Sequence, residues 1–211
     1  MTTAAAPRAT MRTPAFFDDV PTITLADPLA ETLGAAEGGI IEYDYLDAVK
    51  LAGHSCPTVA GAWLMTRKAL AQLYPDRLPR RGEIRVELQQ ALDDGVAGVI
   101  GAVAGLVTGA CNEGGFKGLA GRHGRKGLLR YGVPMRGEIR FTRLDNGATI
   151  ELTHKMTSVP RPEAVTHWMP RALGPQGDAT ALAAFGAAWQ DWVRTILLEH
   201  ADDPAVVIVV A

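Results

Sequence analysis

Residues 53–73 read GHSCPTVAGAWLMTRKALAQL, and this stretch decides the fold. Apolar residues recur in it at roughly helical spacing, which predicts one long helix. Proline is favoured at the first helical position, so we expect the helix to begin at Pro57 with Cys56 as its N-cap. Pro75 disfavours helical geometry at the residue before it, so the helix should end near Tyr74.

Segments typical of strands and helices alternate around this helix. Residues 83–88 alternate polar and apolar side chains, as a half-buried strand does, and residues 137–155 read as a hairpin. The remaining expectations are a helix at 93–107, a glycine-rich loop at 114–132, a loop at 160–175, a helix at 180–200 and a strand buried on both faces at 206–210. Together they predict an α+β fold whose mixed or antiparallel sheet is packed with helices. We expect a single domain at residues 16–211 behind a disordered tail at residues 1–15.

Composition and charge narrow the classes of function. The 211 residues carry a net charge of −2, which gives no field to recruit nucleic acid or an anionic membrane. The apolar run at 96–107 is too short to span a bilayer, and the first residues lack the apolar stretch of a secretory signal. Only two cysteines occur, Cys56 and Cys111, which fits a reducing compartment better than a disulfide scaffold. We therefore expect a soluble cytoplasmic protein.

His54 and Cys56 are the sharpest chemical feature. Two residues apart, they could not share one face of a helix, but they can converge in an irregular segment that leads into one. A cysteine at a helix N-cap has its thiolate stabilised by the helix dipole and by free N–H groups. Imidazole and thiolate together suit zinc, iron, nickel or copper. The alternative is a buried cysteine and a hydrogen-bonded histidine that only pack the start of the helix.

The same segment resembles a known family. Gly-His-x-Cys-Pro, followed by Gly61, is similar to the Gly-His-x-Cys-Pro-(x)3-Gly signature of the FmdE-like family of formylmethanofuran dehydrogenase components. Residues 108–109, 115–119 and 131–132 resemble, in the same order, the family's Thr-Gly-Cys-Thr-x-Gly-Lys-Gly-Asn-Leu and Tyr-Gly segments.

This resemblance implies a metal-binding protein of α+β fold that is accessory to redox or one-carbon metabolism. His54 and Cys56 match family positions directly, and Cys111 matches one if the loop shifts by one residue. Ile100 and Ala102 stand where the family usually has a cysteine and an aspartate, which indicates a divergent member. Zinc is the metal that we expect first, with nickel or iron as alternatives.

Further metal ligands could come from the segment Cys111-Asn112-Glu113. A thiolate and a carboxylate from Cys111 and Glu113 would complete a four-ligand set with the first pair. The alternative is a glycine-rich turn with an inert thiol. His154 and His167 flank the proline-rich segment, and either could supply an additional ligand or lie on the surface.

The glycine-rich loop is also basic. Lys117, Arg122 and Arg125 lie among glycines and could cradle a phosphate or another anion through backbone N–H groups and charge. A solvated basic loop is the alternative. His123 lies in the same loop and, with Glu113, is a candidate general base.

Four functions follow from these features. The first is a metal-binding accessory protein, and the second is a metalloenzyme whose metal keeps a position open. The third is a haem protein with Cys56 or His54 as axial ligand, and the fourth is a metal-free scaffold. We expect a small-molecule or redox-enzyme partner. A homodimer is also expected, because the small-residue helix at 93–107 and the apolar C-terminal strand offer surfaces for one.

Overall fold

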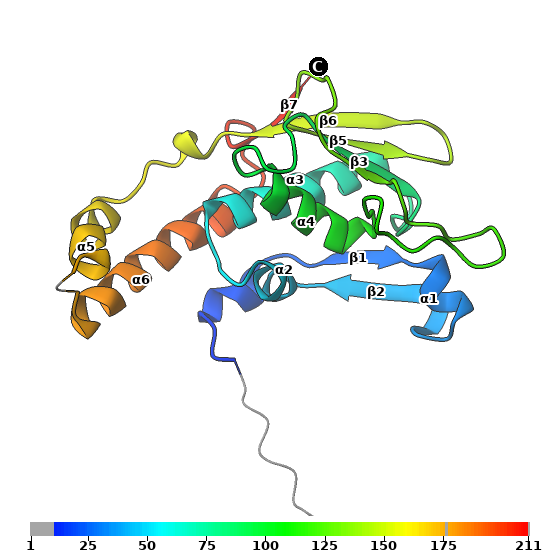
Figure 1. Ribbon diagram of the computed structural model, residues 1–211. Helices are drawn as coiled ribbons and strands as arrows, with labels where there is room; N and C mark the ends of the chain where they lie inside the picture. Colours follow the sequence, from blue (N-terminus) through cyan, green and yellow to red (C-terminus); the bar gives the residue numbers. More distant parts are fainter. Residues whose placement is uncertain (1–10, 176, 211) are drawn as a thin grey trace, which may run out of the picture.

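A five-stranded mixed sheet forms the top of the molecule in the computed structural model, which describes residues 11–175 and 177–210 (Figure 1). The strand order is β4-β3-β5-β6-β7, in which β3 and β4 are parallel and all other neighbours are antiparallel. The strands are β3 (Ile84–Leu88), β4 (Leu129–Arg130), β5 (Ile139–Arg143), β6 (Thr149–His154) and β7 (Val207–Val210). The predicted α+β fold with a mixed sheet is therefore confirmed.

Helices α3 (Pro57–Leu73) and α4 (Ala97–Thr108) pack against each other and against the sheet, α3 on β6 and β7 and α4 on β3. The core lies at this interface, where Trp63, Met65 and Phe141 are fully buried. Such close-packed apolar burial is the main driving force for the fold.

The remaining elements lie below and beside this core (Figure 1). An antiparallel pair runs beneath the two helices, and a helical hairpin projects to one side (Figure 1). The pair is β1 (Ile23–Ala26) with β2 (Ile40–Tyr43), accompanied by α1 (Pro28–Thr32) and α2 (Tyr45–Ala52), and the hairpin is α5 (Glu163–Leu173) with α6 (Ala179–Arg194). Short 3-10 turns cover Ala15–Asp19, Glu37–Gly39 and Met156–Ser158, and a π-helical turn, Thr195–Glu199, continues α6. Residues 1–10 of the predicted tail lie outside the described residues.

The predicted start of α3 is confirmed, with Pro57 as its first residue and Cys56 as its N-cap. The hairpin is confirmed too, because β5 pairs with β6 around a turn in which Gly147 has a φ of 74°. That left-handed conformation costs a glycine little, which is why a turn could be predicted at this position.

Two predictions about segments were wrong. Residues 160–175 are not a loop, because α5 forms within them and packs on α6. Pro160 and Pro162 precede the helix, where proline is tolerated, and only Pro170 lies inside it. The last strand, β7, is not buried on both faces: it is the edge strand of the sheet, and Val209 is exposed. β-Branched residues suit a pleated edge strand as well as a central one.

The small-residue face of α4 is covered by its own chain. A Cβ on Gly101 would collide with the Tyr131 hydroxyl, and one on Gly105 would lie 2.8 Å from the Ala110 carbonyl oxygen. These glycines therefore permit close internal packing, and the homodimer expected from this helix stays a prediction. Within residues 11–175 and 177–210, every helix is too short or too polar to cross a bilayer.

A buried ion cluster centred on Asp27 joins the two-stranded sheet of β1 and β2, here called the lower sheet, to the end of α4. The Asp27 side chain is 3% exposed, and its Oδ1 accepts hydrogen bonds from the backbone N–H groups of Leu29 and Ala30 at the start of α1. Arg125 Nη2 donates to the same oxygen at 2.7 Å, and Arg81 Nη1 donates to Oδ2 at 2.8 Å. One carboxylate thus holds three segments that are far apart in the sequence.

Arg81 extends the cluster to the C-terminus of α4. Its Nη2 donates to the carbonyl of Leu106 at 2.9 Å, and its Nε donates to that of Val107 at 3.1 Å. These carbonyls are among the last four of the helix, which have no partner inside it. Burial acts to raise the pKa of Asp27, but the hydrogen bonds from Arg125 and Arg81 outweigh it, so the pKa of this carboxyl is lowered.

We predict that Asp27→Asn lowers the free energy of unfolding by about 3 kcal/mol, because it leaves the buried Arg125 and the partly buried Arg81 without their counter-charge. Asparagine still caps a helix, so the loss reports the ion cluster and not the cap. Urea denaturation measures it. Asp202→Asn is the control, because Asp202 also pairs with an arginine, Arg67, but its side chain is 82% exposed. Equal small losses in both variants would show that the cluster does not stabilise the fold.

The same cluster predicts a dependence on pH. A carboxyl whose pKa is lower in the folded state stabilises the fold above its unfolded pKa, and that stability is lost as the pH falls through the folded pKa. We therefore expect that the free energy of unfolding of the wild type decreases as the pH is lowered past about 4. Asp27→Asn should show a smaller fall between pH 5 and pH 2, measured by urea denaturation at each pH; an identical pH profile would contradict this.

Candidate functional site

The segment 53–56 connects α2 to α3 and is held from two sides (Figure 1). Gly53 ends α2 in the left-handed conformation, with a φ of 76°. The Ser55 hydroxyl lies 3.1 Å from the Tyr45 hydroxyl, and the Ser55 carbonyl accepts hydrogen bonds from Trp189 Nε1 at 2.9 Å and Gln190 Nε2 at 3.2 Å. The backbone of the motif is therefore fixed between α2 and α6.

Cys56 and His54 keep their reactive atoms uncommitted. The Cys56 side chain is partly buried, is a free cysteine and makes no capping hydrogen bond to α3. His54 is exposed, and its Nδ1 lies 2.9 Å from the carbonyl oxygen of Ala52. A carbonyl can only accept, so Nδ1 carries the proton and Nε2 has its lone pair free. Among the described residues, no partner of this Nε2 is found.

His154, at the end of β6, is oriented by a carboxylate. Its Nδ1 lies 2.5 Å from Glu138 Oε2, and its backbone N–H donates to the same oxygen at 3.3 Å. Both side chains are largely buried, with 11% of His154 and 18% of Glu138 exposed. A carboxylate that holds one ring nitrogen fixes the tautomer and presents the other nitrogen, as it does for histidines that bind metals.

Gly61 brings this histidine to the motif helix. A Cβ at position 61 would lie 2.7 Å from His154 Cδ2 and 3.1 Å from Cγ, so the ring packs directly on the helix backbone. Gly61 is five residues after Cys56, a rise of about 7.5 Å along α3. The last glycine of the motif thus admits a side chain from β6 near the helix N-terminus.

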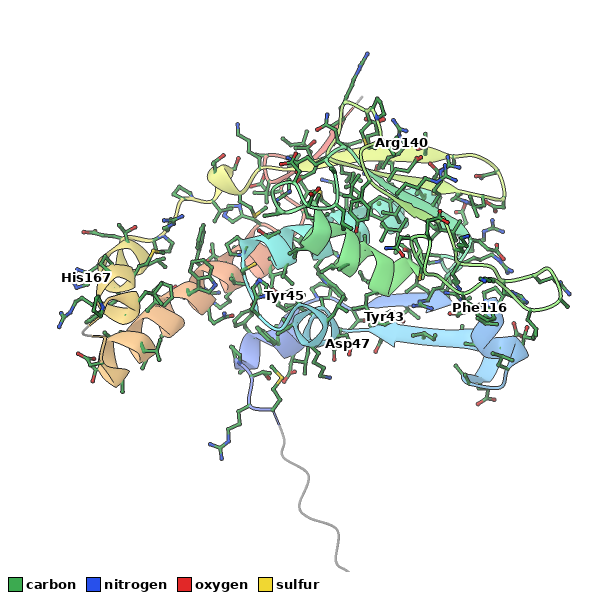
Figure 2. All side chains as sticks on the ribbon, viewed as in Figure 1. Tyr43, Tyr45, Asp47, Phe116, Arg140 and His167 are labelled. Carbon is green, nitrogen blue, oxygen red and sulfur yellow. The ribbon has the colours of Figure 1, made fainter. Side chains whose placement is uncertain are left out.

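The other predicted ligands and bases lie elsewhere. Cys111 is partly buried on the loop after α4, with its Sγ 3.7 Å from the Gly109 carbonyl oxygen, and it is a free cysteine. Glu113 is exposed and pairs with Lys126 at 3.0 Å. His167 is exposed on α5, away from the main body of the molecule (Figure 2). In the described part of the chain, no three His, Cys, Asp or Glu side chains are gathered so as to hold a metal ion.

The three cations of the predicted anion-binding loop differ in their exposure to solvent. Lys117 and Arg122 are exposed, whereas Arg125 is buried against Asp27. His123 has a φ of 60°, and its Nε2 lies 3.5 Å from the Thr32 hydroxyl. Glycine density alone could not show which of the three cations would turn inward.

Sequence reasoning missed Glu138 as the partner of His154. The hairpin gave only a partial signal: its register, in which Ile139 opposes Leu152, places Glu138 opposite Thr153 and not His154, so strand pairing alone does not predict this contact. Asp27 and Arg81 were also missed, because nothing local marks a surface-type charge that tertiary structure buries.

Comparison with known proteins adds no family. No family model matches the chain, and no curated protein and no solved structure matches it either. The resemblance to the FmdE-like family therefore rests on the motifs at residues 53–61 and 108–132, and it stays a prediction.

We predict that Gly61→Ala lowers the free energy of unfolding by about 1–3 kcal/mol, because the new methyl group displaces the His154 ring. The control is Gly186→Ala in α6, where a Cβ would meet no atom within 4 Å. That change should stabilise the protein by up to about 1 kcal/mol, since alanine favours a helix over glycine. Thermal denaturation and the imidazole NMR signals of His154 measure both effects. A Gly61→Ala variant as stable as Gly186→Ala would contradict the packing.

Proposed function

We propose that the protein binds one transition-metal ion at the N-terminal end of α3, through Cys56, His54 and His154. Zinc is the first expectation, with nickel or iron as alternatives, because thiolate and imidazole donors suit these ions. One observation carries the proposal. Both histidines have Nδ1 against an oxygen atom, the Ala52 carbonyl for His54 and the Glu138 carboxylate for His154. In the neutral imidazoles, that arrangement leaves the Nε2 lone pair of each histidine free to bind a metal ion.

Metal binding would require side chains to move. The three donors are not gathered within the described residues, so His54 would have to turn from its present position toward Cys56. His54 is exposed and is held by a single side-chain hydrogen bond, whereas His154 is held by Glu138 and Gly61. We therefore expect His54 to change its side-chain conformation when the metal binds. The position of His154 would then determine where the ion lies.

Three protein donors would leave one position of a four-coordinate zinc ion open. A bound metal with an open position can polarise a water molecule or a carbonyl group. The donor set therefore suits an accessory protein that presents a metal, as the family resemblance implies, and it also suits a metalloenzyme. Glu138 would act only by orienting His154, and the exposed Glu113 has no part in this set.

We predict near-stoichiometric zinc in untagged protein, with most of it lost in Cys56→Ala and in His154→Ala. Elemental analysis after dialysis, together with a visible spectrum after exchange with Co²⁺, measures the content and the thiolate ligation. Cys111→Ala and His167→Ala are matched controls, because they remove the same side-chain types away from α3, and both should keep the metal.

Other outcomes decide between the alternatives. Negligible metal in the wild type, also after incubation with Zn²⁺, would refute the proposal and leave the metal-free scaffold. A Soret band that Cys56→Ala abolishes would replace the metal site with the haem alternative. Metal that Cys111→Ala removes and His154→Ala keeps would restore the ligand set expected from the sequence.

A further inference from the structure

A pocket of about 430 Å³ lies between the lower sheet and the loop that follows α4, away from the residues of the proposed metal site. This volume falls within the range of small-molecule sites, roughly 300–1,000 Å³. Phe116 lies on that loop above the end of the lower sheet, near α1 (Figure 2). The lining includes Leu29, Leu33, Ile41, Cys111, Phe116 and Arg125.

One wall of the pocket is apolar and reaches solvent. Leu29 and Leu33 from α1 and its end, Ile41 from β2 and Phe116 from the loop line this wall. Leu33 is 61% exposed and Phe116 is 45% exposed, so two large apolar side chains face water at the mouth. Such an apolar surface beside a concave site favours a ligand with an apolar body.

The other end of the pocket is cationic and buried. Arg125 is 5% exposed, and only its Nη2 donates a hydrogen bond to Asp27. Its Nε is buried without a hydrogen-bond partner in the described part of the chain, but it packs against Gly82, which does not line this pocket. Its Nη1 lies against Gly109, which also lines the pocket, and a Cβ at that position would collide with it. Nη1 is therefore the donor of this guanidinium that can reach a ligand in the pocket.

The cluster around Arg125 is short of one negative charge. Arg81 and Arg125 contribute two positive charges and Asp27 one negative charge, which leaves a net charge of +1. A guanidinium binds carboxylates well, because its parallel N–H groups match their two oxygens. A singly charged carboxylate would balance the cluster, whereas a phosphate would overcompensate it and leave the apolar wall unused.

We infer that this pocket is a binding site for a small organic acid, with the carboxylate at Arg125 and an apolar body against Leu33 and Phe116. The site is independent of the proposed metal, since none of its lining residues is His54, Cys56 or His154. Cys111 also lines it, so a bound acid would shield the Cys111 thiol from reagents. Cys56 lies outside the pocket, and in protein freed of metal by EDTA its thiol serves as an internal reference.

The test uses octanoate as the probe and 1-octanol as its uncharged counterpart. Isothermal titration calorimetry should show saturable binding of octanoate and much weaker binding of octanol. Octanoate should also slow alkylation of Cys111 by iodoacetamide, read by peptide mass spectrometry, and leave the rate at Cys56 unchanged. Inorganic phosphate should not reproduce this protection.

Leu33→Glu should weaken octanoate binding at least about tenfold, because it removes apolar contact and places a like charge at the mouth. Leu182→Glu is the matched control: it is the same substitution at a similarly exposed leucine, 56%, on α6, and it should bind octanoate as the wild type does. Both positions are exposed, so both variants should fold. Equal affinity for octanoate and octanol, unchanged affinity in Leu33→Glu, equal protection by phosphate, or no binding at millimolar octanoate would each overturn the inference.

Discussion

The ion cluster of Asp27, Arg81 and Arg125 is the interaction on which the arrangement of the lower sheet, α4 and the glycine-rich loop depends. Asp27 caps α1 with one oxygen and binds two guanidinium groups, so a single buried side chain joins residues 98 positions apart. A buried charge is tolerated only when it is paired and hydrogen-bonded, and here each component depends on the others. The cluster also brings Arg125 to the wall of the proposed acid-binding pocket, because Asp27, to which Arg125 is bound, lines the same pocket.

The two candidate sites share one structural feature. At each of them, a glycine leaves room for a side chain from another segment of the chain. Gly61 lets His154 pack on α3, and Gly109 lets Arg125 lie against the end of α4. In both cases a Cβ would occupy the space of an ionisable side chain. Glycine is thus used for close approach as much as for backbone freedom, and the functional group comes from elsewhere in the chain.

The site at α3 differs from the pocket in its rigidity. Ser55 is held by Tyr45, Trp189 and Gln190, and His154 is held by Glu138, so the frame around Cys56 is prepared in advance. The exposed His54 is held by one side-chain hydrogen bond, to the Ala52 carbonyl. At the proposed metal site, such a frame would lower the free-energy cost of binding an ion, because much of the side-chain ordering has already occurred on folding. In the pocket, by contrast, the exposed mouth at Leu33 and Phe116 makes access easy and leaves affinity to the buried guanidinium.

Periodicity and proline placement determined the local elements of this protein by themselves. The start of α3 at Pro57, the Cys56 cap and the hairpin of β5 and β6 follow from rules that act within a few residues. The same local rules failed for α5, where packing on α6 outweighs the prolines, and for β7, whose place at the sheet edge depends on strand order.

Which side chains meet was decided only by the tertiary structure. His54 and Cys56 could be singled out because they are neighbours in the sequence. The contacts of His154 with Glu138 and Gly61 depend on segments that are distant in the sequence. So does the burial of Arg125 against Asp27, whereas Lys117 and Arg122 of the same loop are exposed. Sequence spacing carries no such information, because the free energy of a buried charge depends on all the groups that surround it in space.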